Sequence, residues 1–512
     1  MSLVSAAFLA FVALTALIYY LVPSGARRWV LLAASLAFCA SCGFYSLVFV
    51  LLAAVTTFIG GLLCGPSKSR GLRNAAAVIT VVLNLGILCA VRFYGVIGLF
   101  AERLNNVFGA TGSTRTFMLY AVPVGMAFYT LQLIGYTLDC RWEKIAPEKN
   151  FFRYLLFATY FPYFTSGPMN SYAALSVKLD GSKDARLTLG RVRDSAIRIA
   201  WGFFKKLVIA DRIAVVVNTI YGNHESYCGL YVFIGAACFA IQLYADFSGC
   251  MEVVLGASHL LGIEMPENFN SPFLAHTIRE YWQRWHITLG GWLRDYLFYP
   301  MLRTSLFVKI GDGAKKLFGK KRGKKVPVYF ALIILWAAVG YWHGGLMKYV
   351  IGTGLLHCFY IILGELVEPV SVKLRKKLHS EKWPYKVFQT ARTFFLICLG
   401  HIFFRAANVP DALAMYRAIF QPFAIDGEWI ASLGLDTSNL IVLLIAFALL
   451  VAVDVYKYRE KQEEEPRLIL AKLNEKPMAV SWAVFMILLI TVLIFGLYGL
   501  GYDSGAFIYA RI

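Results

Sequence analysis

Long runs of apolar residues with almost no charge recur along the whole chain. Four of them are long enough to cross a bilayer as helices, at residues 3–22, 44–63, 117–138 and 478–497. A spanning helix needs about 20 apolar residues, so each of these runs predicts a transmembrane helix. Shorter runs that also predict spans lie at residues 29–40, 75–91, 230–244, 328–342, 346–363, 387–404 and 440–453. The pattern predicts an all-α, polytopic membrane protein with about 11–13 transmembrane helices.

The first run, at residues 3–22, has two interpretations. A cleaved signal peptide would carry a basic segment before its apolar stretch. Here that segment is missing, and the run leads directly into more hydrophobic sequence. We therefore expect a retained spanning helix.

Polar residues interrupt the apolar pattern between residues 140 and 325. Such residues are costly at membrane depth, so they tend to line cavities rather than face lipid. Residues 161–168 read Phe-Pro-Tyr-Phe-Thr-Ser-Gly-Pro, which predicts a re-entrant or broken helix. Lys205 and Lys206 follow an aromatic segment and are expected to reach a headgroup layer.

Residues 278–300 predict an amphipathic helix at the membrane interface. Large apolar side chains recur there at helical spacing, and charged residues supply the polar faces. The apolar positions are Trp282, Trp285, Leu289 and Trp292.

Composition and charge support a membrane protein rather than a nucleic-acid-binding one. The chain is 59% hydrophobic and 16% charged, and its net charge is +20. Its basic residues gather in short loops between apolar runs, most densely at residues 309–325 and 373–386. Cytoplasmic loops collect Lys and Arg, so we expect both stretches inside and both chain ends outside.

His343 is the strongest candidate for chemistry. It closes an apolar run in the segment Tyr-Trp-His-Gly-Gly, where Gly344 and Gly345 would let backbone or substrate approach the imidazole. Trp342 is placed to wall a narrow channel. From these residues alone, His343 is either catalytic or a hydrogen-bonded packing histidine. No hydrolase elbow, phosphate loop, metal-binding HExxH or dinucleotide fingerprint stands in a suitable context.

Two further polar residues stand out. His286, in Trp-Gln-Arg-Trp-His, either lines a cytoplasmic entrance or lies at the membrane surface among aromatic residues. Asp246 ends an apolar run, and a buried carboxylate needs a partner, so we expect it to hold a nearby Arg or His.

Several sequence blocks together resemble the bacterial membrane-bound O-acyltransferase family. The segment at 281–289, Tyr-Trp-Gln-Arg-Trp-His-Ile-Thr-Leu, is followed by Trp-Leu-Arg-Asp-Tyr at 292–296 and looks like the family signature. Further blocks in the family's order stand at residues 167–168, 203–206, 246–249, 266–270 and 342–344. The match runs from about Val122 to Arg405. Well-known bacterial relatives of this kind are the alginate O-acetyltransferase membrane subunit and the teichoic-acid D-alanyl transferase.

The resemblance implies a fold and a site. The fold would be many tilted helices, with re-entrant and interfacial pieces, around a central tunnel. His343 would be catalytic, and His286 would lie in the tunnel near its cytoplasmic mouth. Residues expected to line the tunnel or bind substrate are Trp342, Trp285, Trp282, Arg284, Asp246, Ser248, Asn268 and Asp295.

The resemblance also implies the reaction and its partners. An acyl group, acetyl or D-alanyl in type, would move from a cytoplasmic thioester, acyl-CoA or acyl carrier protein, to hydroxyls of an extracytoplasmic polysaccharide or teichoic acid. Transfer would be direct or through an acyl-relay partner protein, in a bacterial plasma membrane. We expect no bound cofactor, no metal and no nucleic-acid partner.

We expect one membrane domain over residues 1–512. Its parts are N-terminal spanning helices at 1–139, a catalytic core at 140–405 and C-terminal spanning helices at 406–512. Two alternatives stay open. One is a transporter or flippase for a polymer precursor, which predicts inverted repeats that the sequence does not show. The other is a family member acting on protein or lipid acceptors.

Overall fold

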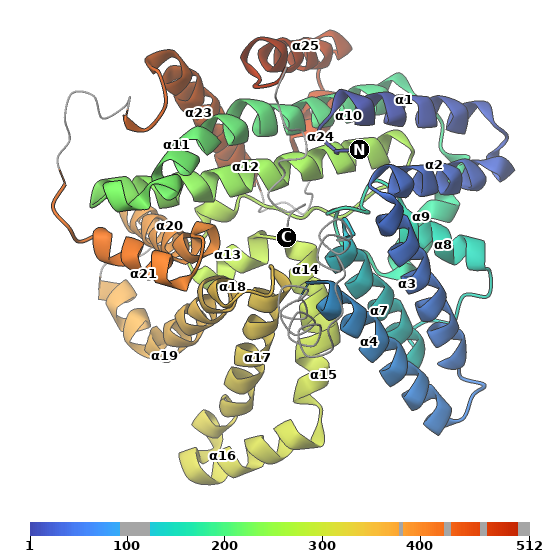
Figure 1. Ribbon diagram of the computed structural model, residues 1–512, viewed down its shortest axis with the longest axis horizontal. Helices are drawn as coiled ribbons and strands as arrows, with labels where there is room; N and C mark the ends of the chain where they lie inside the picture. Colours follow the sequence, from blue (N-terminus) through green and yellow to red (C-terminus); the bar gives the residue numbers. More distant parts are fainter. Residues whose placement is uncertain (93–122, 378–381, 424–431, 461–467, 500–512) are drawn as a thin grey trace, which may run out of the picture. The chain divides into compact units, whose positions relative to one another are not determined.

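The computed structural model describes residues 1–92, 123–377, 382–423, 432–460 and 468–499 (Figure 1). Within these ranges the chain is all-α, as predicted. The described residues form no strand, and their one isolated β-bridge joins Phe269 and Trp285. Contacts divide the described chain into two compact units, and the prediction of one membrane domain stays a prediction.

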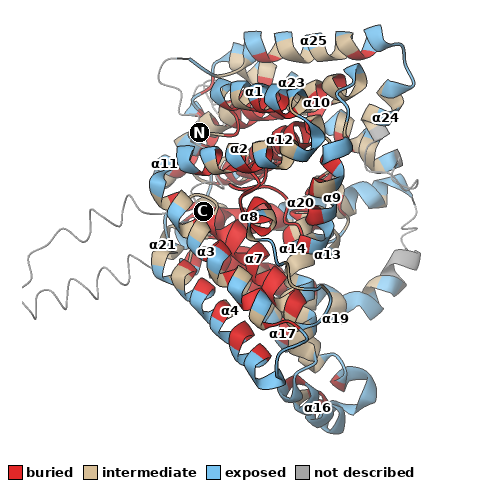
Figure 2. Ribbon diagram, turned by 90° about the vertical axis from the view of Figure 1, so that its right-hand side faces the viewer, coloured by how far each residue is buried: buried red, intermediate tan, exposed pale blue. Residues whose placement is uncertain are grey.

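The first unit contains Met1–Ile199 and Met251–Pro266. Its helices are α1 (Ala6–Leu21), α2 (Arg27–Ser41), α3 (Phe44–Leu63), α4 (Arg70–Arg92), α7 (Met126–Arg141), α8 (Phe151–Thr159), α9 (Tyr172–Gly181) and most of α10 (Leu189–Phe203). Nearly every residue of α7 is buried, as its colour in Figure 2 shows. Glycines let its neighbours approach closely, because a Cβ at Gly61 of α3 would meet the Tyr136 ring of α7 at 2.4 Å.

The segment between α8 and α9 is irregular and buried, which confirms the prediction for residues 161–168. A Cβ at Gly125, which has a φ of 76°, would lie 2.2 Å from the carbonyl oxygen of Phe164. Only glycine fits this close approach without strain.

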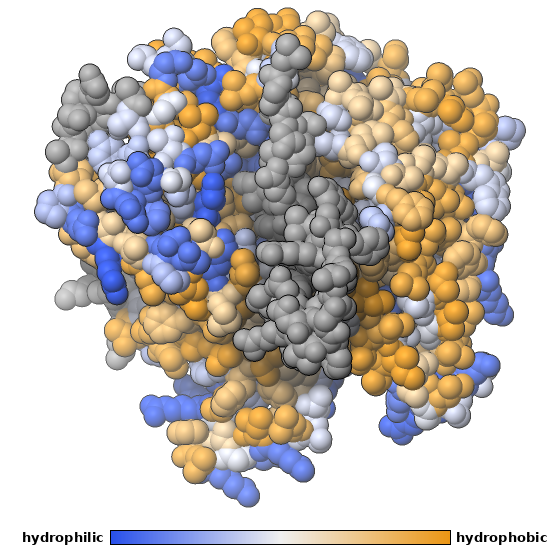
Figure 3. Space-filling model, viewed as in Figure 1, coloured by the Kyte–Doolittle hydropathy of each residue, from blue (hydrophilic) through white to orange (hydrophobic). Residues whose placement is uncertain are grey.

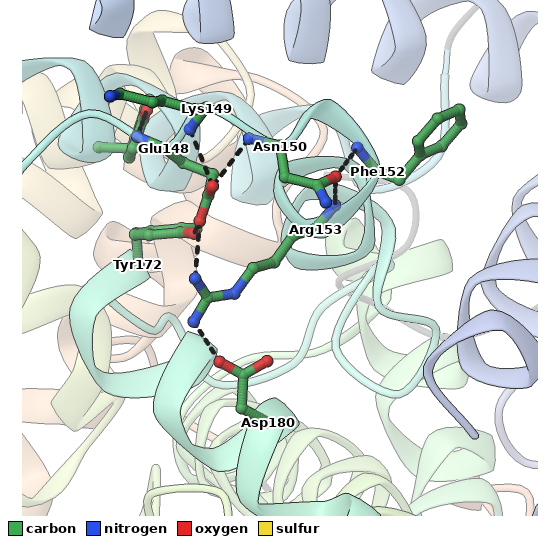
Figure 4. A network of polar contacts seen from close by, with 8 residues as sticks. Glu148, Lys149, Asn150, Phe152, Arg153, Tyr172 and Asp180 are labelled. Carbon is green, nitrogen blue, oxygen red and sulfur yellow. Dashed lines mark hydrogen bonds and ion pairs between the residues drawn. The ribbon is translucent and has the colours of Figure 1, made fainter. Parts of the chain in front are cut away.

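A network of charged and polar side chains connects α8 with α9 in the first unit (Figure 4). The Glu148 carboxylate accepts hydrogen bonds from the backbone N–H groups of Lys149 and Asn150, both at 2.8 Å, and from the Tyr172 hydroxyl. Arg153 pairs with Glu148 at 3.0 Å and also with Asp180. Each charge in this network therefore faces an opposite charge or a hydrogen-bond donor.

The second unit contains Ala200–Cys250 and Glu267–Tyr502. Its longer helices are α11 (Asp211–Gly222), most of α12 (Leu230–Leu260), α16 (Ser305–Gly323), α17 (Val326–Trp342), α19 (Leu356–Lys377), α20 (Trp383–Arg405), α21 (Val409–Ala418), α23 (Thr437–Glu460) and α25 (Met478–Phe495). Its shorter helices are α13 (Ile278–Arg284), α14 (Ile287–Leu293), α15 (Tyr299–Leu302), α18 (Met347–Tyr349) and α24 (Leu468–Asn474). Single π-helical turns occupy Phe204–Ala210, Arg294–Phe298 and Val350–Leu355.

Small residues bring α17 and α20 against the π-helical turn Val350–Leu355. A Cβ at Gly340 of α17 would lie 2.6 Å from the backbone of Tyr349, and one at Gly352 would lie 2.1 Å from the Phe403 side chain of α20. Such close backbone packing is common where helices associate inside a membrane. It fixes the end of α17, where His343 lies.

Every apolar run predicted to span falls on a helix, except that residues 117–122 lie outside the described residues. By length and composition, the described helices that could cross a membrane number seven. They are Phe44–Leu63, Arg70–Val91, Leu230–Leu260, Met347–Val372, Trp383–Arg405, Thr437–Arg459 and Met478–Phe495. The pair α16 and α17, bent by 91°, would add an eighth. This count is lower than the predicted 11–13 because runs such as α1 and α2 form helices shorter than 18 residues.

Apolar side chains also cover much of the outer surface. Figure 3 shows hydrophobic residues over the N-terminal helices, and α4 exposes Val78, Ile79 and Val82. Contiguous exposed apolar surface on this scale is typical of lipid-facing helices. The structure thus supports a multi-pass membrane protein.

One expectation about a loop is wrong. Most of the basic run at residues 309–325 lies on helix α16 rather than in a loop. The helix is interrupted at Gly319, whose φ of 75° breaks the helical path. Many of its lysines are still exposed, so the run keeps the character of a positively charged surface.

Candidate active site

His343 lies at the C-terminal end of α17. Its backbone N–H donates to the carbonyl of Val339 at 3.2 Å, so the last turn of the helix holds it in place. Gly344 and Gly345 follow with positive φ. A Cβ at Gly344 would meet the Tyr349 ring at 2.6 Å, which explains why the turn after His343 uses glycine.

The His343 side chain is only 2% exposed and is surrounded by aromatic rings. Its ring centroid lies 5.0 Å from that of Trp342 and 5.5 Å from that of Phe404 in α20. Both contacts are edge-to-face, an arrangement that aromatic rings prefer. The imidazole is therefore held by rings from two helices rather than placed on a flexible loop.

Residues 278–300 do not form the single interfacial helix that the sequence predicted. Helix α13 ends at Arg284, α14 begins at Ile287, and His286 between them is left-handed with φ 48° and ψ 50°. A left-handed residue other than glycine costs about 1–2 kcal/mol. Contacts with a neighbouring loop hold the bend, because the N–H of Ile287 donates to the Asn268 carbonyl and that of Asn270 donates to the Arg284 carbonyl, each at 3.0 Å.

His286 is 3% exposed, so it is buried in the second unit rather than placed at its surface. Its Nδ1 lies 3.3 Å from the Oδ1 of Asn268. The same oxygen accepts hydrogen bonds from the Thr288 hydroxyl at 2.9 Å and from the Thr288 N–H at 3.2 Å. Asn268, fully buried, thus fixes both the bend and the ring that projects from it.

Trp342 connects the two candidate histidines. Its ring centroid is 5.0 Å from His343 and 5.9 Å from His286. The two imidazoles come from chain segments far apart in sequence, and one indole contacts both. The structure therefore brings together the two histidines and the tryptophan that the sequence singled out.

The other predicted residues of the Trp-Gln-Arg-Trp segment pack around this bend. Trp285 lies against Phe269 at 5.0 Å and Tyr281 at 5.6 Å between ring centroids. Arg284 pairs with Glu280 at 2.8 Å and donates to the Asn270 carbonyl at 3.2 Å.

Trp282 faces a different part of the second unit. Its ring lies 4.8 Å from Trp336 of α17 and 5.1 Å from His357 of α19, measured between centroids. Trp282 thus connects the bend with the helix that carries His343.

Asp246 is buried, and the partner that the described contacts give it is a lysine, so the expectation of an Arg or His partner stays a prediction. Its Oδ1 lies 2.9 Å from Lys206 Nζ, which is also 2.8 Å from Asp211. Lys205 and Lys206 are both buried, so the expectation that they reach a headgroup layer is wrong. Lys205 donates to the backbone carbonyl of Ser248 at 3.3 Å. A buried cation between two carboxylates stabilises the fold only while all three are present.

Asp295 is placed differently from the other predicted residues. It lies in the π-helical turn Arg294–Phe298, is exposed, and contacts the adjacent Arg294 at 3.3 Å. Among the described contacts, it makes none with either candidate histidine.

Two further buried histidines, His401 and His357, lie in the second unit with His343. His401 is buried in α20 and shares Phe404 with it, at 6.4 Å between centroids. His357 is buried in α19 and packs against α20, because a Cβ at Gly400 of α20 would lie 2.6 Å from the His357 Nε2. Neither stands in a sequence motif, so only tertiary packing identifies this histidine-rich region.

The arrangement suits proton transfer in a site shielded from water. An imidazole is the side chain whose ordinary pKa lies nearest neutral pH, and in its neutral form it has a lone pair that accepts a proton. Buried aromatic walls exclude competing water. Among the described residues, no cluster of His, Cys, Asp and Glu is arranged to hold a metal ion.

Comparison with known proteins supports the family resemblance that the sequence blocks indicated. The model of the membrane-bound O-acyltransferase family matches residues 145–311. A probable alginate O-acetylase AlgI from Pseudomonas syringae pv. tomato is 27% identical over 91% of this chain and 84% of its own length. A peptidoglycan O-acetyltransferase from Helicobacter pylori is 25% identical, over 67% of this chain and 64% of its own. A teichoic acid D-alanyltransferase from Bacillus subtilis is 28% identical over 55% of this chain and 68% of its own.

The family match covers the bend with His286, and the alginate-type relative extends over nearly the whole chain. The helical architecture and the apolar spans agree with these matches. Residues 145–311 thus match the membrane-bound O-acyltransferase family, and the relatives indicate that the protein is a multi-pass membrane acyltransferase of the bacterial plasma membrane.

Proposed function

We propose that the protein transfers an acyl group from a cytoplasmic thioester to hydroxyls of an extracytoplasmic polysaccharide or teichoic acid, with His343 as general base. The supporting observation is the buried position of His343 beside Trp342 and Phe404 at the end of α17. The relatives' names supply the acceptor class, since they act on alginate, peptidoglycan and teichoic acid. Transfer is direct or proceeds through a partner protein that relays the acyl group.

The reaction needs one base and no covalent enzyme intermediate. His343 takes the proton of the acceptor hydroxyl as its oxygen attacks the thioester carbonyl, and a tetrahedral oxyanion forms. When that intermediate collapses, the C–S bond breaks and the imidazolium returns the proton to the departing thiolate. A general base contributes about 10²- to 10⁴-fold, and alignment of donor and acceptor supplies much of the rest.

His286 has a distinct role in this proposal. It contacts Trp342, as His343 does, and lies in the bend that Asn268 fixes. In this proposal it contacts the donor in the cytoplasmic half of the predicted tunnel. His286→Ala should raise the KM for the thioester while leaving the fold intact. Unchanged donor kinetics in this variant would make His286 a packing residue.

The donor and the acyl group are tested together. Purified protein in lipid nanodiscs is given radiolabelled acetyl-CoA, acetyl carrier protein or D-alanyl carrier protein, with alginate or lipoteichoic acid as acceptor. We expect label to enter the polymer as an alkali-labile ester from one of these thioesters. Transport of a polymer precursor into vesicles, without any ester formation, would support the transporter alternative instead.

The orientation of the chain is part of the proposal. The positive-inside rule places α16 on the cytoplasmic side, so the end of α17 with His343 lies farther toward the outside. Lys320→Cys in a cysteine-free background should escape a membrane-impermeant maleimide added to whole cells. Strong labelling from outside would reverse the assignment of donor and acceptor sides.

A further inference from the structure

Lys348 is a buried lysine a few residues beyond His343. It is 8% exposed, and its Nζ donates to the backbone carbonyls of Phe404 at 3.3 Å and Ala406 at 2.5 Å. These carbonyls belong to the C-terminal end of α20, where a helix carries partial negative charge. An ammonium group has three donors, so the two carbonyls leave one for another acceptor.

A second cation lies beside Lys348 in the fold. The two carbonyls that Lys348 contacts belong to the residues on either side of Arg405, which is half-buried at the end of α20. Its guanidinium donates to the side chain of Asn218 at 2.8 Å and lies over the Tyr221 ring, 5.7 Å from the centroid. The described contacts thus use one of the five N–H donors of the Arg405 guanidinium.

Among the described residues, no carboxylate forms an ion pair with Lys348 or Arg405. A buried cation next to a second cation is costly unless an anion balances the charges, so the two residues are candidates for binding an anion. Capping the end of α20 explains the position of Lys348 but does not balance the charge of Arg405.

Aromatic contacts connect this cation pair to the candidate catalytic histidine. Tyr349 lies against Phe404 at 5.1 Å between centroids, and Phe404 lies against His343 at 5.5 Å. In the proposed orientation, α17 and α20 both run outward, so Lys348 and Arg405 stand at the outer end of the site. That is the side from which the acceptor enters.

We propose that Lys348 and Arg405 form an anion-binding site for the acceptor, taking a carboxylate or phosphate group of an acidic polymer. This rests on the proposed function and deepens it by naming the acceptor's charge. The guanidinium plane suits two-point binding of a carboxylate or phosphate, and the ammonium adds a point charge. The site would hold the polymer so that a neighbouring hydroxyl faces His343.

The test compares acceptors that differ in charge. Purified protein in nanodiscs is given a uronic-acid oligosaccharide, a glycerol-phosphate oligomer and a neutral cello-oligosaccharide of similar length, each with the thioester that the wild type uses. Lys348→Met and Arg405→Gln should each raise the KM for the acidic acceptor at least about 10-fold, the size expected for a charge-assisted hydrogen bond. The KM for the thioester should not change.

Charge-retaining variants separate binding from folding. Lys348→Arg and Arg405→Lys should recover most of the loss, and Arg417→Gln, an exposed arginine on α21, should behave as wild type. Preference for the uronic-acid or the glycerol-phosphate probe identifies the source of the anion. Equal losses on the neutral acceptor, or a wild type that uses neutral and acidic acceptors equally, would overturn the proposal.

A binding measurement keeps this proposal distinguishable from the proposed function. Binding of the two acidic oligomers to His343→Gln protein is measured with and without Lys348→Met, and again with Arg405→Gln, which serves if the lysine variant is unstable. We expect at least one oligomer to bind and each added substitution to weaken it about 10-fold. Binding that ignores both substitutions would contradict the anion site, whereas intact binding without transfer by the wild type would contradict only the proposed function.

Discussion

The second unit buries two lysines in opposite ways. Lys206 lies between two carboxylates, Asp211 at 2.8 Å and Asp246 at 2.9 Å. Lys348 donates hydrogen bonds to the backbone carbonyls on either side of another cation, Arg405. Both side chains are removed from water to a similar degree, so burial alone does not separate them.

The two lysines differ in whether the described protein supplies an opposite charge. Lys206 finds its opposite charges within the protein, which is typical of a group that holds helices in place. The pair of Lys348 and Arg405 gains from an added anion. We interpret the first as part of the scaffold and the second as part of the site, and the predictions below test this distinction.

The largest effect on stability is expected at the cluster around Lys206. Lys206→Met removes the cation that faces the buried Asp246 and the partly buried Asp211, and breaking a buried pair in this way costs about 3–5 kcal/mol. Lys348→Met leaves only helix-terminal carbonyls, which should cost about 1–3 kcal/mol. Thermal unfolding in detergent, followed by fluorescence, measures both variants.

A double variant checks the cause. Asp246→Asn combined with Lys206→Met should be less destabilised than the sum of the two single variants, because both single changes remove the same contact between the Lys206 ammonium and the Asp246 carboxylate. If Lys348→Met is the more destabilising of the two lysine variants, the assignment of scaffold and site is reversed.

A smaller effect is expected at Asn268, which belongs to the site but is fully engaged in hydrogen bonds. Asn268→Ala leaves the Thr288 hydroxyl and N–H without their acceptor, at a cost of about 1–3 kcal/mol, and loosens His286. We expect a lower unfolding midpoint together with a higher KM for the thioester. Asn270→Ala is the matched control, since Asn270 bonds in the same loop through its backbone. A lower stability with an unchanged KM for the thioester would show that Asn268 supports the fold and not the binding of the thioester.

The smallest effect is expected in the first unit, at Glu148. Burial alone would raise the pKa of this carboxyl, but hydrogen bonds from Tyr172 and the N–H of Asn150, with the Arg153 charge, outweigh it and hold the pKa below its usual value. A lowered pKa stabilises the folded state above the unfolded pKa, and this stability is lost as the pH falls through the folded pKa.

Glu148→Gln should therefore lower the unfolding midpoint by a constant amount between pH 5 and 7, corresponding to about 1 kcal/mol, and acyl transfer should not change. The difference from wild type should shrink as the pH falls below the usual glutamate pKa of about 4.3 and through the lower pKa of the folded protein, where the wild-type carboxyl takes up its proton. Asp312→Asn removes an exposed carboxyl and is the control. A difference that grows toward acid pH would contradict the sign of the pKa shift.

The hydrophobic pattern of the sequence predicted most of the helices of the fold. The apolar runs predicted the helices, because a bilayer demands long apolar segments whatever their neighbours are. The irregular segment at residues 161–168 was also predictable, since its prolines and Gly167 exclude a continuous helix. The position of His343 at the end of α17 agrees with its place at the end of an apolar run in the sequence.

Tertiary contacts account for what the sequence did not predict. The spacing of Trp282, Trp285 and Trp292 is helical, but pairing with the loop at Asn268 bends the chain at His286. The local sequence pattern does not reveal that His286 contacts Asn268, which lies 18 residues away in sequence. The same holds for Lys206, whose carboxylate Asp246 lies on another helix, and for the meeting of Lys348 with the end of α20.

The central claim is that His343 supplies the base, and His343→Gln tests it most directly. Glutamine keeps much of the size and hydrogen-bonding capacity of histidine but has no basic lone pair. His401→Gln is the matched control, because His401 is equally buried and packs on the same Phe404 ring. The measurement is the rate of acyl transfer to polymer by each purified variant at saturating thioester.

We predict that His343→Gln lowers the rate at least about 10²-fold with normal thioester binding, while His401→Gln stays within about 10-fold of wild type. A His343→Gln enzyme that keeps near-normal transfer would contradict the account. His343 would then be a packing histidine, and the base would have to be another group.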